Sequence, residues 1–142
     1  MNKNTVLTLE VFRKKAIEKE QQRIKFTDIE VDGFGLVRFN RPTDNQLIEY
    51  SNRISNAFKF NKKGEVLGQD LTEIYEANKE LVYITCEFLQ DKKLRESLEI
   101  KDPMDMPFKV FGIDETQNLA DKIDKAFSSE SVKEKVEEEV KN

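Results

Sequence analysis

Residues 24–40, IKFTDIEVDGFGLVRFN, decide the fold class of this 142-residue chain. Apolar and charged residues alternate on both sides of a glycine-containing segment, which is the pattern of a β-hairpin. Gly33-Phe34-Gly35 is the expected loop, because Gly35 can adopt the positive φ that a three-residue loop needs. A hairpin alone is only marginally stable in water, so its apolar face should pack against helices. This loop predicts three cross-strand pairs, namely Val31 with Val37, Ile29 with Phe39, and Glu30 with Arg38.

Residues 8–23, which precede the hairpin, have the spacing of a charged amphipathic helix. Leu9, Phe12 and Ala16 fall on one face, while most other positions hold Lys, Arg, Glu or Gln. The apolar stripe fades after Ala16. We therefore expect only the first half of this helix to bury side chains.

Helix-start signals divide the chain that follows the hairpin into several helices. The first of these helices should carry its apolar stripe as far as Ala57 and Phe58. A polar segment with Gly64 and Gly68 then predicts a loop. The start signals, in chain order, are Thr43 with Gln46, Asp70 with Glu73, Asp91, Asp102-Pro103 and Asp114.

The helix that starts near Asp70 is the most apolar segment, and it predicts the centre of the core. It is apolar on more than one face and should continue through Phe88 and Leu89. The last predicted helix carries Leu119, Ala120, Ile123 and Phe127 on one face. The elements together predict an α+β fold that is mostly α-helical, with several helices around one N-terminal hairpin.

The C-terminal stretch differs in composition from the rest of the chain. Val132, Val136 and Val140 are four residues apart, and nearly every other position is charged or Ser. This pattern is typical of a weak amphipathic helix with too little apolar area to order itself. We therefore expect one globular domain over residues 1–127 and a charged tail over residues 128–142, which is either frayed or folds on a partner.

Charge and hydropathy exclude several classes of partner. The net charge is −4 and the pI is about 5.1, which argues against nucleic acid. Residues 1–25 hold seven Lys or Arg against three Glu, about +4, and residues 114–142 hold five Lys against nine Asp or Glu, about −4. This asymmetry can steer self-association or a charged partner. There is neither a secretory signal nor an apolar stretch of the roughly 20 residues that span a bilayer, so we expect a soluble cytoplasmic protein.

The residues needed for common catalytic and metal sites are missing from the sequence. There is no His and one Cys, Cys86, which excludes His-based triads and structural zinc sites. Lys62-Lys63-Gly64 through Gly68 lacks the Lys and Ser or Thr that follow the second Gly of a phosphate-binding loop. Asp28, Glu30 and Asp32 imitate the start of a calcium loop whose last ligand would be Phe39. We expect no enzyme activity, no metal and no cofactor, and Cys86 should be a buried apolar residue.

Apolar residues that the core does not consume are the candidate partner-binding positions. Phe34 lies at a predicted loop tip and Phe60 lies beside a polar loop, where large apolar side chains are hard to bury. The first helix and the tail contribute the others. Local packing or solvation is the alternative for all of them. The candidates are Leu9, Phe12, Phe34, Phe60, Val132, Val136 and Val140.

The order of these parts resembles the XkdN-like tail assembly chaperones of contractile-tailed phages and prophages of Gram-positive bacteria. The similarity covers roughly residues 8–127. It includes a charged first helix, the hairpin running into RPTD, the segment ANKELVY followed by DKKLRESLEIKDP, and a closing helix, IDETQNLADKIDKAF. The tail with its valines has no counterpart in this resemblance.

The resemblance implies a protein that acts by binding. It would bind the tape measure protein, with tail tube protein as a second partner, and would keep the tape measure soluble in the cytoplasm of the bacterial host during tail assembly. It would then be absent from the finished particle. The alternatives are a structural adaptor or connector that stays in the tail and a small enzyme that works without His.

Overall fold

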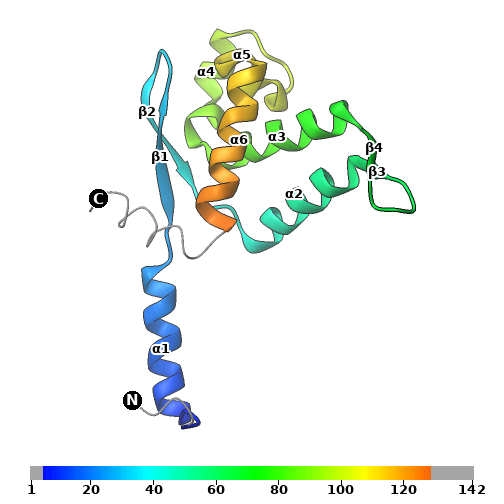
Figure 1. Cartoon of the computed structure of the whole chain (residues 1–142). Coiled ribbons are helices and arrows are strands. Elements are labelled where there is room, and N and C mark those ends of the chain that lie inside the picture. Colours follow the sequence, from blue (N-terminus) through cyan, green and yellow to red (C-terminus); the bar gives the residue numbers. More distant parts are fainter. Residues whose placement is uncertain (1–4, 129–142) are drawn as a thin grey trace, which may run out of the picture.

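The computed structural model describes residues 5–128, and this part of the chain is α+β and mostly helical (Figure 1). Two 3₁₀ turns, Glu87–Gln90 and Pro103–Asp105, lie between the α-helices. The α-helices are α1 (Leu9–Gln22), α2 (Asp44–Asn56), α3 (Leu71–Thr85), α4 (Lys92–Ser97), α5 (Met106–Phe111) and α6 (Ile113–Ser128). The strands form two antiparallel hairpins, β1 (Phe26–Val31) with β2 (Gly35–Asn40), and β3 (Phe58–Phe60) with β4 (Val66–Gln69).

The first hairpin is confirmed, but its register differs from the prediction. Ile29 pairs with Val37 and Val31 pairs with Gly35, a shift of two residues. The turn closes one residue earlier than expected because the Phe34 amide donates to the Val31 carbonyl (2.9 Å). Gly35 has the positive φ that was predicted, 92°, and Gly33 has one as well, 84°. Side chains alternate with period two, so a shift of two keeps every residue on its predicted face. The predicted inward residues Ile29, Val31, Val37 and Phe39 are all buried.

Helix α3 lies at the centre of the core, as predicted. It packs against α2, α5, α6 and strand β2. The predicted face of α6 is buried, and Cys86, just after α3, is also buried. The buried cluster is formed by Ile29, Val31, Val37, Phe39, Leu47, Leu81, Val82, Cys86, Leu89, Met106, Leu119, Ala120, Ile123 and Phe127.

Four of the five predicted helix starts, at Thr43, Asp70, Asp91 and Asp102, are formed by side-chain caps. The fifth is wrong by one residue or more, because α6 begins at Ile113 and Asp114 lies within its first turn. Thr43 and Gln46 form a reciprocal capping box at the start of α2. Asp70 accepts from the Glu73 amide (3.2 Å) at the start of α3. The Glu73 carboxylate binds Arg53 of α2 (2.6 Å) instead of closing a second capping box. The expected capping sequence therefore joins two helices in addition to starting one.

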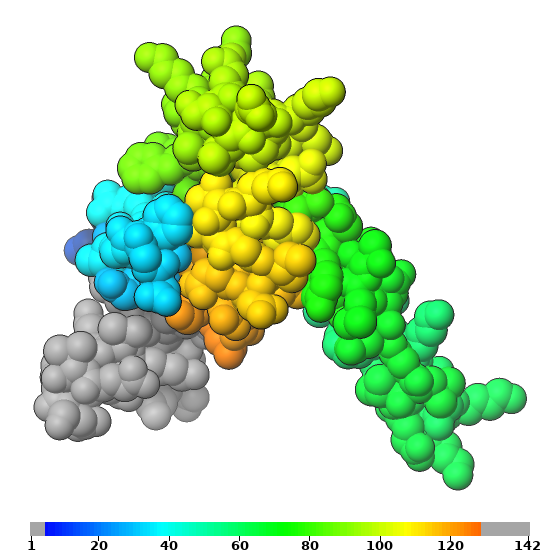
Figure 2. Space-filling model, turned by 90° about the horizontal axis from the view of Figure 1, so that it is seen from above, coloured from blue at the N-terminus to red at the C-terminus, as the bar shows by residue number. Residues whose placement is uncertain are grey.

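The second hairpin contradicts the predicted polar loop and the prediction of a single hairpin. Helix α2 ends at Asn56, and Phe58 lies in β3 rather than on that helix. The Asn61 side chain organises the turn by accepting from the amides of Lys63 (2.9 Å) and Glu65 (3.0 Å). Gly64 has the positive φ, 82°, that this tight turn requires. The hairpin ends an arm formed with α2 and the start of α3, which Figure 2 shows projecting from the body.

Helix α3 is shorter than predicted. It ends at Thr85, since Cys86 has extended backbone angles. The side-chain amide of Gln90 donates to the carbonyls of Tyr83 (2.9 Å) and Ile84 (3.4 Å) at this end of the helix. The 3₁₀ turn that follows points Phe88 outwards, where 71% of its surface is exposed. The expectation that Phe88 belongs to the core is therefore wrong, while Leu89 is buried as expected.

Helix α1 confirms the predicted helix over residues 8–23 but does not pack against the body. None of its 14 residues is buried, including those in its first half. Figure 1 shows α1 extending away from the sheet and the other helices. The apolar stripe that was expected to bury side chains is therefore open along the described part of the chain.

Candidate functional site

Helix α1 presents an open apolar surface, because none of its residues is buried. The Thr8 hydroxyl caps the helix by accepting from the Val11 amide (3.2 Å). About two turns of helix then place Leu9, Phe12 and Ala16 on one side, and we name these three residues the α1 face. Leu9 is 69% exposed and Phe12 is 60% exposed. Both predicted residues therefore lie on one open surface.

The isolation of α1 bears on its stability. Helices of fewer than about 12–15 residues are marginal in water, and most helix stability in proteins comes from packing an apolar face. Helix α1 has 14 residues and no packed face among the described residues. A segment that covers the α1 face would therefore stabilise this helix as well as bury Leu9 and Phe12.

The base of α1 is fixed to the end of α6 through Arg41. The Arg41 guanidinium donates to the Ile24 carbonyl (3.2 Å), just after α1, and to the Phe127 carbonyl (3.2 Å), near the end of α6. The same group lies 5.7 Å from the centre of the Phe127 ring. Arg41 thereby connects two segments that are distant in sequence, the one that follows α1 and the end of α6.

A groove of ≈ 510 Å³ opens at this junction. Its apolar lining residues are Leu47 and Phe127, which are buried, and Ile48 of α2, which is exposed. Its lining residues are Arg23, Arg41, Asp44, Leu47, Ile48, Ser51, Asn52, Phe127 and Ser128. The groove contains both the end of α1 and the last described residue of the chain.

The second hairpin places another set of exposed apolar side chains at the end of its arm. Phe60, a predicted partner-binding residue, is 56% exposed on β3. Val66 and Leu67 on β4 are also exposed, and neither was predicted, because the polar residues around them are typical of a loop. The alternation of Phe58, Lys59 and Phe60 was the signal that could have identified a strand.

Phe34 lies at the tip of the first hairpin, as predicted, and is 57% exposed. Its ring also makes an edge-to-face contact with Phe111 of α5, with the ring centres 5.2 Å apart. One side of the ring therefore stabilises the hairpin tip against the body, and the other side faces solvent. The sequence did not predict the Phe111 contact because the two residues are far apart in the chain.

The outer face of the first hairpin combines an ion pair with apolar side chains. Arg38 donates twice to the Asp28 carboxylate (2.9 and 3.0 Å) and covers the Phe26 ring at 3.7 Å. The hydrogen bonds from Arg38 lower the pKa of Asp28. Leu36, beside them, is exposed and was also missed. Since Asp28 is engaged by Arg38, it is poorly placed to act as a cation ligand.

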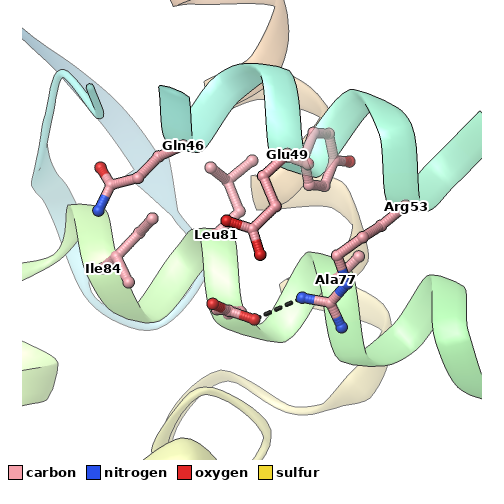
Figure 3. A pocket seen from close by; sticks show the side chains of 8 residues that line it. Gln46, Glu49, Arg53, Ala77, Leu81 and Ile84 are labelled. Carbon is pink, nitrogen blue, oxygen red and sulfur yellow. Dashed lines mark hydrogen bonds and ion pairs between the residues drawn. The ribbon is translucent and has the colours of Figure 1, made fainter. Parts of the chain in front are cut away.

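A small pocket of ≈ 120 Å³ lies between α2 and α3 (Figure 3). Its apolar side is formed by Ala77, Leu81 and Ile84 of α3, and Figure 3 shows Gln46, Glu49 and Arg53 of α2 facing them. Arg53 forms an ion pair with Glu80 across the mouth, in addition to its bond with Glu73. The pocket has room for about one side chain, which is small for a metabolite site.

Tyr50 lines this pocket and is the one residue there with a strongly shifted pKa value. Its hydroxyl donates to Asn78 Oδ1 (2.6 Å). Burial raises the pKa of Tyr50 to about 12, and the charges of Asp124 and Asp121 add to this effect. A phenol with so high a pKa stays protonated at neutral pH and acts as a hydrogen-bond donor that joins α2 to α3.

The described residues offer little for nucleophilic or metal chemistry. The Cys86 thiol is buried, and burial raises its pKa, which disfavours the reactive thiolate. Within residues 5–128 no group of three or more His, Cys, Asp or Glu could hold a metal ion. None of the helices in the same range is long and apolar enough to cross a bilayer.

The remaining predicted positions, Val132, Val136 and Val140, lie outside the described residues. The four that are described do not form one site. Leu9 and Phe12 share the α1 face, whereas Phe34 and Phe60 lie on different hairpins. Comparison with protein-family models, with curated proteins and with solved structures finds no match to this chain.

Proposed function

We propose that this chain is a phage tail assembly chaperone that binds the tape measure protein and keeps it soluble while the tail is built. The observation that supports the proposal is α1, a charged helix whose apolar face is open and which stands away from a well-packed body. A protein that binds another chain reversibly needs such a surface, and it needs no active site.

The partner that suits the α1 face is an amphipathic helix. Two helices pack by interleaving side chains that recur every three or four residues, and Leu9, Phe12 and Ala16 have this spacing. A tape measure protein before tube assembly is a long helical chain with apolar faces to cover. The charged remainder of α1 would stay in solvent and help to keep the complex dissolved.

The proposed partners and location follow from this role. The tape measure protein is the main client, tail tube protein is a second partner, and self-association is a further one. The complex would form in the cytoplasm of the bacterial host, and the chaperone would leave before the particle is finished. Detection of the chain in purified particles would identify a structural adaptor instead.

The test is co-expression with the long helical protein encoded immediately downstream, followed by a pull-down. We expect the downstream protein to become soluble and to co-purify with the wild-type chain. The double variant L9E/F12E should lose this activity because two charges on the α1 face cannot be buried against an apolar partner without a large free-energy cost.

The matched control is V11E, which places a single glutamate on the opposite side of α1. It should retain the client. If the folded wild-type chain leaves the downstream protein insoluble and unbound, the chaperone proposal is wrong. If V11E and L9E/F12E are equally defective, binding does not use the α1 face.

A further inference from the structure

Helix α1 projects from the base of the first hairpin (Figure 1), and three residues, Arg23, Ile24 and Lys25, connect it to β1. We name these three residues the link. The Ile24 side chain packs against the core cluster, and the Ile24 carbonyl accepts from the Arg41 guanidinium (3.2 Å). The Lys25 carbonyl accepts from the Arg41 amide (2.8 Å), which continues the pairing of β1 with β2 by one residue towards α1. The link therefore extends the hairpin and is not a free tether.

The last turn of α1 is bonded to the same link. The Lys25 ammonium donates to the Glu20 carboxylate (3.0 Å), and the Arg23 guanidinium lies 3.6 Å from that carboxylate. The Arg23 amide also donates to the Glu20 carbonyl (3.2 Å). The hydrogen bond from Lys25, together with the charges of Lys25, Arg23 and Arg41, lowers the pKa of Glu20. The end of the helix is thus held by the residues that follow it.

Two helices of the body hold the link from other sides. Arg23 lies 3.9 Å from the carboxylate of Asp44, in the first turn of α2. Arg41 donates to the Phe127 carbonyl near the end of α6 (3.2 Å). Contacts thus reach the link from the hairpin, α2 and α6. A change in the direction of α1 would have to break several of them together.

We propose that Arg41 and the link are positioning residues that hold α1 in a fixed direction from the body. Helix α1 is then a rigid extension that presents the α1 face in one place. The link contains neither Gly nor Pro, and it differs from the Gly- and Ser-rich sequences that form flexible linkers. A surface that is already in position costs less free energy to order when a partner binds. The benefit to client binding rests on the proposed function, whereas the fixed direction does not.

Distances between two spin labels test the direction of α1 without a client. Labels would be attached at K14C, on the side of α1 opposite to the α1 face, and at K109C, which is exposed on α5, with C86A removing the native thiol. We expect the full chain to give one narrow distance distribution. Insertion of Gly-Ser-Gly after Gln22 should widen it by about 10 Å, the r.m.s. span of a flexible three-residue segment.

The variant R41M tests Arg41 itself. It should widen the distribution because both side-chain hydrogen bonds of Arg41 are lost, and R41K, which can still donate to one carbonyl, should give an intermediate width. The matched control is R38M on the same strand, which also removes two hydrogen bonds but lies outside the link, and its distribution should stay narrow. If R41M does not fold, the insertion carries the test, since it leaves the body and Arg41 unchanged.

Two results would overturn the proposal. A broad distribution in the labelled chain with its natural link would mean that α1 changes direction freely. Distributions that are equally narrow with the insertion and with the natural link would mean that the link does not set the direction of α1. An R41M distribution as narrow as that of R38M would remove Arg41 from the positioning residues.

These outcomes are separate from the test of the proposed function. The insertion variant keeps Leu9, Phe12 and Ala16, and with both proposals correct it should capture the downstream protein several-fold less well than the wild-type chain. If the distances show a fixed α1 but the wild-type pull-down fails, the chaperone proposal is wrong and the positioning stands. If the wild-type pull-down succeeds and the distribution is broad, the chaperone proposal stands and the positioning is wrong.

Discussion

At the scale of single residues, Asp124 on α6 is the side chain whose charge is least well accommodated in residues 5–128. Its Oδ1 atom is buried without a hydrogen-bond partner in this part of the chain. Burial raises the pKa of Asp124, and the nearby charge of Asp121 adds to the increase. The charged form is therefore held in an unfavourable place close to Tyr50.

The variant D124N should stabilise the protein at neutral pH. A raised pKa in the folded state means that the folded chain binds more protons than the unfolded chain, so the free energy of unfolding falls as the pH rises from 3.8 through the folded pKa. Asparagine does not ionise, so the variant does not lose this part of the free energy of unfolding as the pH rises. Urea unfolding from pH 7 down to pH 4 should show a gain that is largest at pH 7 and shrinks towards acid.

The control for D124N is D121N, one turn earlier on α6. Asp121 is exposed and pairs with Lys125 (2.8 Å), so its replacement removes a surface ion pair that contributes about 0–1 kcal/mol. We expect little change in the free energy of unfolding for D121N. A loss of stability in D124N at pH 7 would mean that the carboxylate is well solvated in the folded protein.

At the scale of elements, Arg41 is the side chain that connects α1, the first hairpin and α6. The variant R41M keeps the length of the side chain but removes both hydrogen bonds, leaving the partly buried carbonyls of Ile24 and Phe127 without this donor. We expect the free energy of unfolding to fall by about 1–3 kcal/mol in urea.

The comparison for R41M is R38M on β2. Arg38 also makes two hydrogen bonds, to Asp28, but both partners lie at the surface. Exposed ion pairs are worth about 0–1 kcal/mol. A similar, small effect of both substitutions would show that the Arg41 junction adds little to stability, and the carbonyls would then be bonded to water.

The elements also show where sequence reasoning succeeded. Strand alternation predicted the buried face of the first hairpin despite the wrong register, because a shift of two residues preserves the faces. Capping residues such as Thr43 located helix starts, since a cap acts within three or four residues of itself. Local patterns of this kind are visible in one sequence.

The errors concern features that depend on distant or competing contacts. Phe88 continues the apolar stripe of α3 in the sequence, but the helix ends at Thr85. The Gln90 side chain donates hydrogen bonds to two of the last carbonyls of the helix. The second hairpin was hidden because the Asn61 side chain builds its turn within a polar segment. At the candidate site, the α1 face was predicted from spacing, whereas the Arg41 junction joins residues 86 positions apart and has no local signal.

At the scale of the whole molecule, the structure combines a packed body with a projecting helix, α1, that adds no residue to the core. The stability of the body should therefore be independent of the α1 face. With no client present, L9E/F12E should change the free energy of unfolding by no more than about 0.5 kcal/mol, as is usual for surface substitutions.

The corresponding change in the body is L119A. Leu119 of α6 is fully buried against the core cluster, and truncation of such a side chain costs about 2–5 kcal/mol. Urea unfolding of the two proteins should separate them clearly. If L9E/F12E costs as much as L119A, α1 folds against the body in solution and its apolar face is not open. If the expected contrast is found, loss of client binding in L9E/F12E can be attributed to the binding surface itself, because the body that carries it is unchanged.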